Sequence, residues 1–262
     1  TRKPHIWHIR EALKEDYNLL YDSRLQYRCA LRNAKQVICI SNYVRKIHRD
    51  MLTQSNVLIL KDGFDIKKYV LHKAYQTKRA VYNLMICGYI QEGKGQLDAV
   101  RAVDHLVHDY GLKNIYLRIV GGNSGVYCEK IKRYIIEKHL QDYVSILPFQ
   151  EDLKELRRDT DIALMCSRNE ALGRVTVESM LSENLVIGAD AAGTKEIIRD
   201  GINGYLYKTG NIHALCDKIY YAIQHWDKQE RIIRNAQKYA IQNYDSDRYV
   251  EKILAIYHKV TN

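Results

Sequence analysis

Two glutamates eight positions apart, Glu170 and Glu178, flank the dipeptide Gly173-Arg174. A carboxylate can accept hydrogen bonds from sugar hydroxyls, or stabilise positive charge that develops during a reaction. A helix that begins between the two would also offer unpaired N–H groups to an anion. The arrangement therefore suits a ligand with both a phosphate and sugar hydroxyls. For an arbitrary pair, two surface glutamates are the more ordinary interpretation.

The elements around this pair support the first interpretation. The apolar run 162–166 predicts a buried parallel strand, and the pattern over 175–183 predicts a helix with one apolar face. Gly173 allows a tight turn between them. We therefore expect Glu170 in a loop at the carboxyl end of a strand, and Glu178 one to two turns into the next helix. Open α/β sheets bind ligands in that crevice.

Two glycine-rich turns could contribute to the same crevice. Residues 88–95 follow a predicted strand and open a helix, and Lys94 within them could reach a pyrophosphate as a point charge. An ordinary turn with a surface lysine fits this segment as well. Residues 121–125 could bring backbone close to a ligand, or could be only a flexible connection.

Composition narrows the class of protein. The chain has 262 residues, a net charge of +10 and six cysteines, with no Cys-x-x-Cys pair. A disulfide framework or a zinc site is therefore not expected, and a reducing compartment fits. No apolar run approaches the roughly 18 residues that cross a bilayer, and no signal peptide is evident. We expect a cytoplasmic protein. Because the chain begins at Thr1, we also expect it to be a piece of something longer.

The positive charge belongs to the first third of the chain. Residues 1–79 contain 17 Lys and Arg against 7 Asp and Glu, whereas residues 80–262 contain 24 of each. Nucleic acid is not the expected partner, although Arg24, Arg28 and Arg32 lie near two tyrosines. Contact with an anionic membrane surface or a lipid-phosphate acceptor fits better than nucleic acid, and a plain solvated helix face is the preferred interpretation.

Strands and helices alternate along most of the sequence, which predicts a doubly wound parallel sheet. Predicted strands cover 5–9, 36–40, 57–60, 82–87, 115–120, 144–147, 161–166 and 185–187. Predicted helices cover 16–33, 42–52, 95–110, 126–140, 152–159, 174–184 and most of 211–261, with a break at 243–246.

The segment from Ser167 to Tyr207 closely resembles the E-x7-E region of family 4 glycosyltransferases, the retaining, GT-B-fold part of the group 1 glycosyl transferase family. The run 193–196 and the run 200–204 match that family's next segment at the expected distance. The resemblance covers nearly the whole chain, but implies that the beginning of a standard N-terminal domain is absent.

The resemblance implies two Rossmann-like domains that face each other across a cleft. Residues 1–65 would be the end of the N-terminal, acceptor-side domain, and 66–79 a linker. Residues 80–244 would be the complete nucleotide-sugar-binding domain, and 245–262 a helix that crosses back to the N-terminal domain.

The resemblance also assigns roles at the donor site. Lys94 would bind the diphosphate of the donor together with the backbone at the start of the helix. Glu178 would accept hydrogen bonds from the ribose, and Glu170 would stabilise positive charge at the sugar's anomeric carbon. Tyr89 stands where the family usually has an arginine, which would remove one contact to the diphosphate; Arg174 could supply that charge or point into solvent. The donor-binding residues expected in this way are Gly88, Tyr89, Lys94, Gly122, Phe149, Leu172, Gly173, Arg174 and Glu178.

Three positions carry weaker expectations. Phe149 follows a strand where relatives often bind the nucleobase, but core packing is the preferred interpretation. Many relatives place a histidine over the cleft near residue 10, and here that position is Arg10. His8 could share a strand face with Arg10, so either could contact the donor, although a half-buried strand residue is preferred for His8. His105 and His108 lie three apart on a helix, but no carboxylate or cysteine clusters with them in the sequence, so we expect no metal site.

Together these features predict a metal-independent, hexosyl-type retaining glycosyltransferase with no cofactor. Its donor would be a nucleotide sugar, most plausibly UDP-linked, and its acceptor a glycan or lipid-linked molecule of cell-surface polysaccharide synthesis such as capsule assembly. The N-terminal third would allow peripheral membrane contact. Two alternatives stay open: a nucleotide-sugar-binding module without catalysis, and a GT-B epimerase acting on the nucleotide sugar through Glu170, His8 and Glu11.

Overall fold

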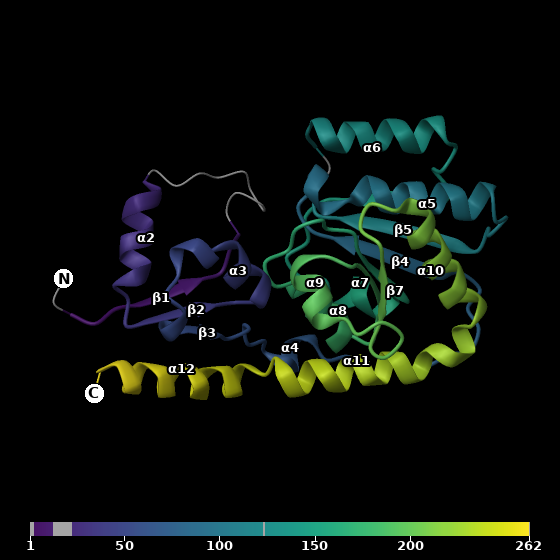
Figure 1. The fold of residues 1–262 in the computed structure, drawn as a ribbon. Coiled ribbons are helices and arrows are strands. Elements are labelled where there is room, and N and C mark those ends of the chain that lie inside the picture. The colour runs from purple at the N-terminus through teal and green to yellow at the C-terminus, as the bar shows by residue number, and fades with distance from the viewer. Residues whose placement is uncertain (1–2, 13–22, 123, 262) are drawn as a thin grey trace.

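The computed structural model describes residues 3–12, 23–122 and 124–261. Two parallel sheets organise them, one with three strands in the order β1-β2-β3 and one with six in the order β6-β5-β4-β7-β8-β9 (Figure 1). The predicted α/β architecture is confirmed. We call the part around the smaller sheet the N-terminal unit and the part around the larger sheet the C-terminal unit.

Each strand is short and apolar. The smaller sheet consists of β1 (Ile6–Ile9), β2 (Gln36–Cys39) and β3 (Val57–Ile59). The larger sheet consists of β4 (Tyr82–Cys87), β5 (Ile115–Val120), β6 (Val144–Leu147), β7 (Ile162–Met165), β8 (Leu185–Ala189) and β9 (Tyr205–Tyr207).

Helices follow most strands. They are α2 (Arg24–Arg32), α3 (Asn42–Ile47), α4 (Ile66–Tyr69), α5 (Gln96–His108), α6 (Val126–Glu137), α7 (Lys154–Asp159), α8 (Arg174–Leu181), α9 (Ala192–Ile197), α10 (Ile212–Gln224), α11 (Gln229–Asn243) and α12 (Ser246–Thr261). In the C-terminal unit α5, α6 and α10 cover one face of the sheet, and α8, α9 and α11 cover the other (Figure 1). Among the described residues, no helix is long and apolar enough to cross a membrane.

Alternation of side chains along the strands divides the core into two layers. On β7, Ile162 and Leu164 pack with α5 and α10, whereas Ala163 and Met165 pack toward α8. The second layer continues into the N-terminal unit, because it also contains Val37 and other residues of β2. The two units therefore share one apolar cluster through α8.

The strand order reverses between β4 and β7. The chain enters the larger sheet at β4, winds outward to β6, and returns to pair β7 against the other edge of β4, with Leu84 opposite Ile162. The loops that follow these two strands therefore leave the sheet in opposite directions. A crevice opens at such a point, at the carboxyl ends of the strands.

The chain passes from one unit to the other twice, near Phe64 and near Tyr244, and the two passages lie side by side. The Phe64 N–H donates to the Tyr244 carbonyl at 2.7 Å, and the Ser246 N–H donates to the Phe64 carbonyl at 3.0 Å. A side chain at Gly63 would lie 2.7 Å from the Ser246 Cα, so this approach requires glycine. After the second crossing, α12 runs beside the smaller sheet (Figure 1).

Several short elements differ from the prediction. The structure adds α4, α9 and β9, and it interrupts the C-terminal helices at 225–228 as well as at the predicted break. These added elements have three to six residues, which is too few for hydrophobic periodicity to reveal. The helix predicted over 16–33 is seen from Arg24 onward, and residues 13–22 lie outside the described residues.

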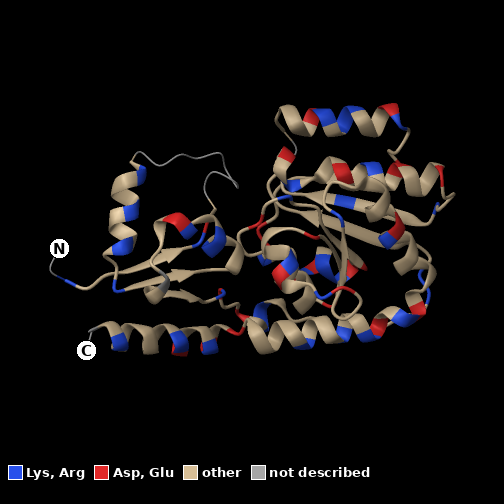
Figure 2. Cartoon of the chain, in the orientation of Figure 1, with Lys and Arg blue, Asp and Glu red and all other residues tan. Residues whose placement is uncertain are grey.

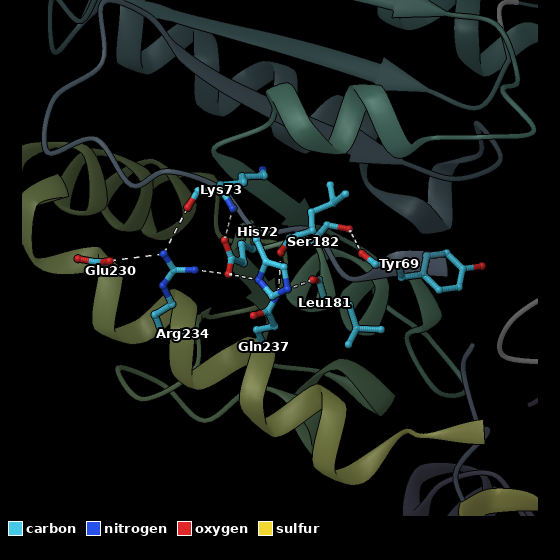
Figure 3. A network of polar contacts seen from close by, with 10 residues as sticks. Tyr69, His72, Lys73, Leu181, Ser182, Glu230, Arg234 and Gln237 are labelled. Atoms are coloured by element: carbon cyan, nitrogen blue, oxygen red, sulfur yellow. Dashed lines mark hydrogen bonds and ion pairs between the residues drawn. The ribbon is translucent and has the colours of Figure 1, made fainter. Parts of the chain in front are cut away.

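The segment between the units is anchored to the C-terminal unit at Lys73, a half-buried lysine whose backbone contacts with α11 and with the end of α8 are seen in Figure 3. Lys73 Nζ donates to the carbonyls of Arg157 at 2.6 Å and Thr160 at 2.7 Å. Its backbone N–H donates to Glu183, which also pairs with Arg234 of α11. Burial lowers the pKa of Lys73 to about 8, although the carboxylates of Asp161 and Glu183 oppose the shift.

This lysine gives a pH-dependent contribution to stability with a defined sign. Between pH 8 and the ordinary lysine pKa, the unfolded chain holds more protons at this site than the folded chain, so the contribution of Lys73 to stability rises with pH. The free energy of unfolding of the wild type, relative to Lys73→Met, should increase by about 2 kcal/mol between pH 7.5 and pH 9.5. Urea denaturation at both pH values measures it. Lys67→Met, at an exposed lysine of α4, should show no such change; a constant difference for Lys73→Met would contradict the prediction.

Candidate functional site

Two cavities lie where β4 and β7 end. The first, the inter-unit cavity, has a volume of about 180 Å³. Arg10 and Asp62 line it from the N-terminal unit, and Lys94, Glu170 and Arg174 line it from the C-terminal unit. This cavity lies at the reversal of strand order and is rich in charge. Half of the twelve site residues expected from the sequence line it: Arg10, Lys94, Glu170, Leu172, Gly173 and Arg174.

The second, the strand-end cavity, has a volume of about 420 Å³ and shares Lys94 and Glu170 with the first. Gly88, Tyr89 and Thr176 also line it. It is bounded by the end of β4 on one side and the start of α8 on the other. The two cavities form a continuous crevice along α8.

The loop that carries Glu170 is held from both units. The Gly193 N–H of α9 donates to the Glu170 carbonyl at 2.7 Å. From the N-terminal unit, the buried Ser41 hydroxyl donates to the Ala171 carbonyl at 2.5 Å, and the Tyr43 hydroxyl donates to Asn169 at 3.1 Å. The backbone of this loop is therefore fixed by contacts on two sides.

Glu170 pairs with Lys94. Lys94 Nζ lies 2.8 Å from Glu170 Oε2, and each side chain is 26% exposed. Lys94 closes the short 3₁₀ turn Glu92–Lys94 that precedes α5. The glycine-rich turn after β4 and the loop after β7, about 75 residues apart in sequence, thus bring opposite charges together at one point.

Glu178 lies four residues into α8, as the sequence predicts. Its Oε2 pairs with Arg157 of α7, and its Oε1 lies 4.0 Å from Arg174 Nη2. The Glu178 side chain is only 13% exposed. Among the described residues it lines neither cavity, and Arg174 stands between it and the inter-unit cavity.

The side chain of Arg174 is about half exposed and reaches from the C-terminal unit to the N-terminal unit. Its Nη1 lies 3.3 Å from Asp62 Oδ2, and its guanidinium lies 4.5 Å from the centroid of the Phe64 ring. Asp62 also pairs with Arg10. Local sequence patterns do not single out Asp62, because a single acid in a turn-rich passage gives no indication of its partners.

A second acid, Glu196 of α9, joins the units in a different way. Its carboxylate accepts hydrogen bonds from the backbone N–H groups of Asn42 at 3.0 Å and Tyr43 at 2.6 Å. These N–H groups belong to the first turn of α3 and have no partner within that helix. A carboxylate from the C-terminal unit therefore helps to cap a helix of the N-terminal unit.

The structure corrects the interpretation of Phe149. Core packing was expected, but Phe149 is 75% exposed, and it follows β6, a strand at the edge of the larger sheet. Tyr89 is equally exposed, at 75%. Gly122 and Phe149 line neither of the two cavities among the described residues.

The two candidate residues of the N-terminal unit, Arg10 and His8, have different surroundings. Arg10 lines the inter-unit cavity. His8 is half-buried, as preferred from the sequence, and its Nε2 lies 3.3 Å from the hydroxyl of Tyr257 on α12. Burial lowers the pKa of His8, and the charge of Arg10 lowers it further against an opposing effect of Asp62.

The expectation that no carboxylate accompanies His105 and His108 is wrong. His105 pairs with Asp109 at 2.5 Å, and His108 pairs with Asp104 at 2.9 Å. Both are pairs of residues four positions apart on one helix face, a spacing that brings side chains together. Among the described residues, no group of three or more His, Cys, Asp or Glu could hold a metal ion.

Comparison with known proteins agrees with this geometry. Residues 72–239 match the family described as Glycosyl transferases group 1. The chain belongs to this family. The match covers α8, Glu170 and Glu178.

Two curated relatives illustrate the family's range. The chain is 23% identical over 215 residues to N-acetyl-alpha-D-glucosaminyl L-malate synthase of Bacillus anthracis, covering 82% of this chain and 55% of the relative. It is 23% identical over 226 residues to GDP-mannose:cellobiosyl-diphosphopolyprenol alpha-mannosyltransferase of Xanthomonas oryzae, covering 85% and 58%. The chain thus spans little more than half the length of these relatives.

Among solved structures, Anabaena Alr3699/HepE in complex with UDP and glucose superposes with a TM-score of 0.87 at 23% identity. The superposition covers 98% of this chain and 72% of that one. The crystal structure of TarM gives a TM-score of 0.83 at 19% identity, covering 97% and 50%. These likenesses show that the group 1 chain has the GT-B fold.

The stability that the contact of Ser41 with the Glu170 loop contributes can be measured by comparison with Ser23, a serine that caps another helix. Ser41 caps α3 through the Val44 N–H at 3.1 Å and also donates to Ala171. Within the described part of the chain, the hydrogen bond of the Ser23 hydroxyl is the cap of α2, through the Gln26 N–H. Ser23→Ala should cost about 1 kcal/mol of unfolding free energy, and Ser41→Ala about 2 to 3 kcal/mol, because a buried carbonyl also loses its partner. Urea denaturation of the two variants measures the difference. Equal losses would show that the bond to Ala171 adds no stability.

Proposed function

We propose that the crevice binds the nucleotide-diphosphate sugar of a retaining glycosyltransferase reaction. The observation that carries the proposal is the placement of Lys94, Glu170 and Glu178 around the start of α8, at the reversal of strand order. A helix start attracts an anion, a lysine strengthens that attraction, and carboxylates accept hydrogen bonds from sugar hydroxyls.

Each residue would then have a distinct role. Lys94 and the backbone of Leu172, Gly173 and Arg174 would hold the diphosphate, without a metal ion. Glu178 would accept hydrogen bonds from the ribose. Glu170 would lie near the donor sugar, where its charge stabilises the positive charge that develops at the anomeric carbon as the diphosphate leaves.

The contact between Lys94 and Glu170 has a consequence for binding. An arriving diphosphate would compete with Glu170 for Lys94 and with Asp62 for Arg174. Binding of the diphosphate would thereby draw Lys94 away from Glu170. The carboxylate of Glu170 would then be left to face the donor sugar. Because Tyr89 replaces the arginine expected after β4, we propose that Arg174 supplies part of the missing charge.

For the donor we propose a UDP-linked hexose, supported by the solved Anabaena protein in complex with UDP and glucose. For the acceptor we propose a glycan or lipid-linked molecule of cell-surface polysaccharide synthesis, at the cytoplasmic face of the membrane. Support comes from the name of the Xanthomonas relative, which includes a diphosphopolyprenol, and from the N-terminal unit. There Lys and Arg are spread over α2 and α3 (Figure 2), and Arg45, Lys46 and Arg49 line a cavity of about 390 Å³.

Calorimetric titration with UDP and with GDP tests the donor site. The wild-type chain should bind UDP in the presence of EDTA, and Glu178→Ala should weaken binding at least tenfold, because the hydrogen bond of a charged acceptor contributes about 1.5 to 3 kcal/mol. Glu137→Ala, at an exposed glutamate of α6, is the matched control and should bind as the wild type does. Failure of the wild type to bind either nucleotide would contradict the proposal, and binding only with a divalent ion would contradict its metal independence.

A further inference from the structure

Arg157, on the short helix α7, is almost completely buried, with 4% of its side chain exposed. It lies outside every segment in which site residues are expected from the sequence. An arginine stays charged under any ordinary condition, so its burial requires a partner of opposite charge. That partner is Glu178, the carboxylate proposed to bind the ribose.

We propose that Arg157 is a positioning residue that fixes the carboxylate of Glu178 and thereby sets how strongly the crevice recognises the ribose hydroxyls of a nucleotide diphosphate. This proposal rests on the proposed function, because it assigns a ribose to Glu178.

The two oxygens of Glu178 have different surroundings. Oε2 contacts Arg157, which is buried, whereas Oε1 lies 4.0 Å from Arg174, which is 47% exposed. One oxygen is thus held from inside the protein and the other is on the side of the crevice. A carboxylate held in this way presents one oxygen to an incoming hydroxyl in a fixed direction, with less freedom to lose on binding.

The charges of the pair act on a residue in the wall of the strand-end cavity. Cys87, at the carboxyl end of β4, lines that cavity. Burial raises the pKa of its thiol to about 11, and the charges of Arg157 and Glu178 act on it in opposite directions. Both charges are therefore close enough to the cavity wall to influence a group in it.

Arg157 is itself held in place at three points. Its guanidinium lies 5.5 Å from the centroid of the Tyr69 ring. Its carbonyl accepts hydrogen bonds from Lys73 Nζ at 2.6 Å and from the amide of Asn184 at 2.8 Å. Asn184 is fully buried and follows α8. The end of the helix that carries Glu178 is therefore tied to the residue that holds its carboxylate.

Energetics favour a positioning role over a contribution to stability. A buried ion pair costs several kcal/mol of desolvation for each ion and on balance contributes little net stability. Arg157 Nε, moreover, finds no hydrogen-bond partner among the described residues, so Glu178 and the ring of Tyr69 orient the guanidinium. Without Arg157, the Glu178 carboxylate could turn toward Arg174, which lies four residues before it on the same helix.

The test compares UDP with 2′,3′-dideoxy-UDP by calorimetry, because the second nucleotide lacks both ribose hydroxyls. The wild type should bind UDP at least tenfold more tightly, and Glu178→Ala should reduce this ratio to within about threefold of unity. Arg157→Met should reduce the ratio to the same extent, and combining the two substitutions should reduce it no further, because the residues act as one unit. Arg157→Lys, which keeps the charge on a shorter donor, should give an intermediate ratio.

The neighbouring Arg158 offers a matched control. It lies on the same helix but is 50% exposed and pairs with Glu155 three residues away. Arg158→Met should leave the ratio unchanged. Thermal denaturation of each variant identifies a loss of folding, and if Arg157→Met does not fold, the comparison of Arg157→Lys with the wild type carries the test.

The possible outcomes are distinguishable. If the wild type binds no UDP, or if Glu178→Ala keeps the wild-type ratio, the proposed function of the crevice fails and the role of Arg157 fails with it. If Glu178→Ala behaves as expected but a folded Arg157→Met keeps the wild-type ratio, only the positioning role is overturned. An equal loss of affinity for both nucleotides in Arg157→Met would also overturn it, because a residue that merely supports the fold would weaken both.

Discussion

The reversal of strand order between β4 and β7 is the constraint on which the site depends. Adjacent parallel strands end at the same edge of the sheet, and here their following loops turn in opposite directions. Lys94 follows one strand and Glu170 follows the other, and this topology alone brings them within 2.8 Å. The start of α8 then lies at the bottom of the crevice, because the second loop must lead into a helix that covers the sheet. Position in the fold thus determines which side chains can act together.

Opposite charges alternate across the crevice in an unbroken series. Arg10 pairs with Asp62, Asp62 with Arg174, Arg174 approaches Glu178, and Glu178 pairs with Arg157. The two acids in this series are 7% and 13% exposed, so salt screens their interactions less than it screens surface pairs. Removing Glu178 would leave Arg157, of which only 4% is exposed, without its counter-charge, which costs more than the pair contributes. Asp62 is also largely buried, so it needs Arg10 or Arg174 beside it. A movement of one unit relative to the other must therefore exchange the Asp62–Arg174 contact for another partner.

Local sequence patterns predicted every strand except β9, the parallel architecture and the positions of Glu170 and Glu178, because each depends on neighbours within about ten residues. Asp62 and Arg157 were missed for the opposite reason: Asp62 meets Arg174 across 112 residues, and Arg157 meets Glu178 across 21 residues, with β7 between their helices. No period or spacing carries such information. Phe149 was misjudged because an aromatic residue after a strand can face the core or the solvent, and only the placement of β6 at the sheet edge decides.

The source of positive charge at the crevice distinguishes this chain from the pattern it resembles. An arginine after β4 would belong wholly to the C-terminal unit, but that position is Tyr89, which carries no charge. Arg174 is oriented instead by Asp62 and by the ring of Phe64, and both lie on the path between the units. If Arg174 contributes to binding an anion, the orientation of its guanidinium depends on how the units are docked. Anion binding and the arrangement of the two units are then linked through one side chain. The free energy by which a bound anion favours one arrangement of the units equals the free energy by which that arrangement favours anion binding.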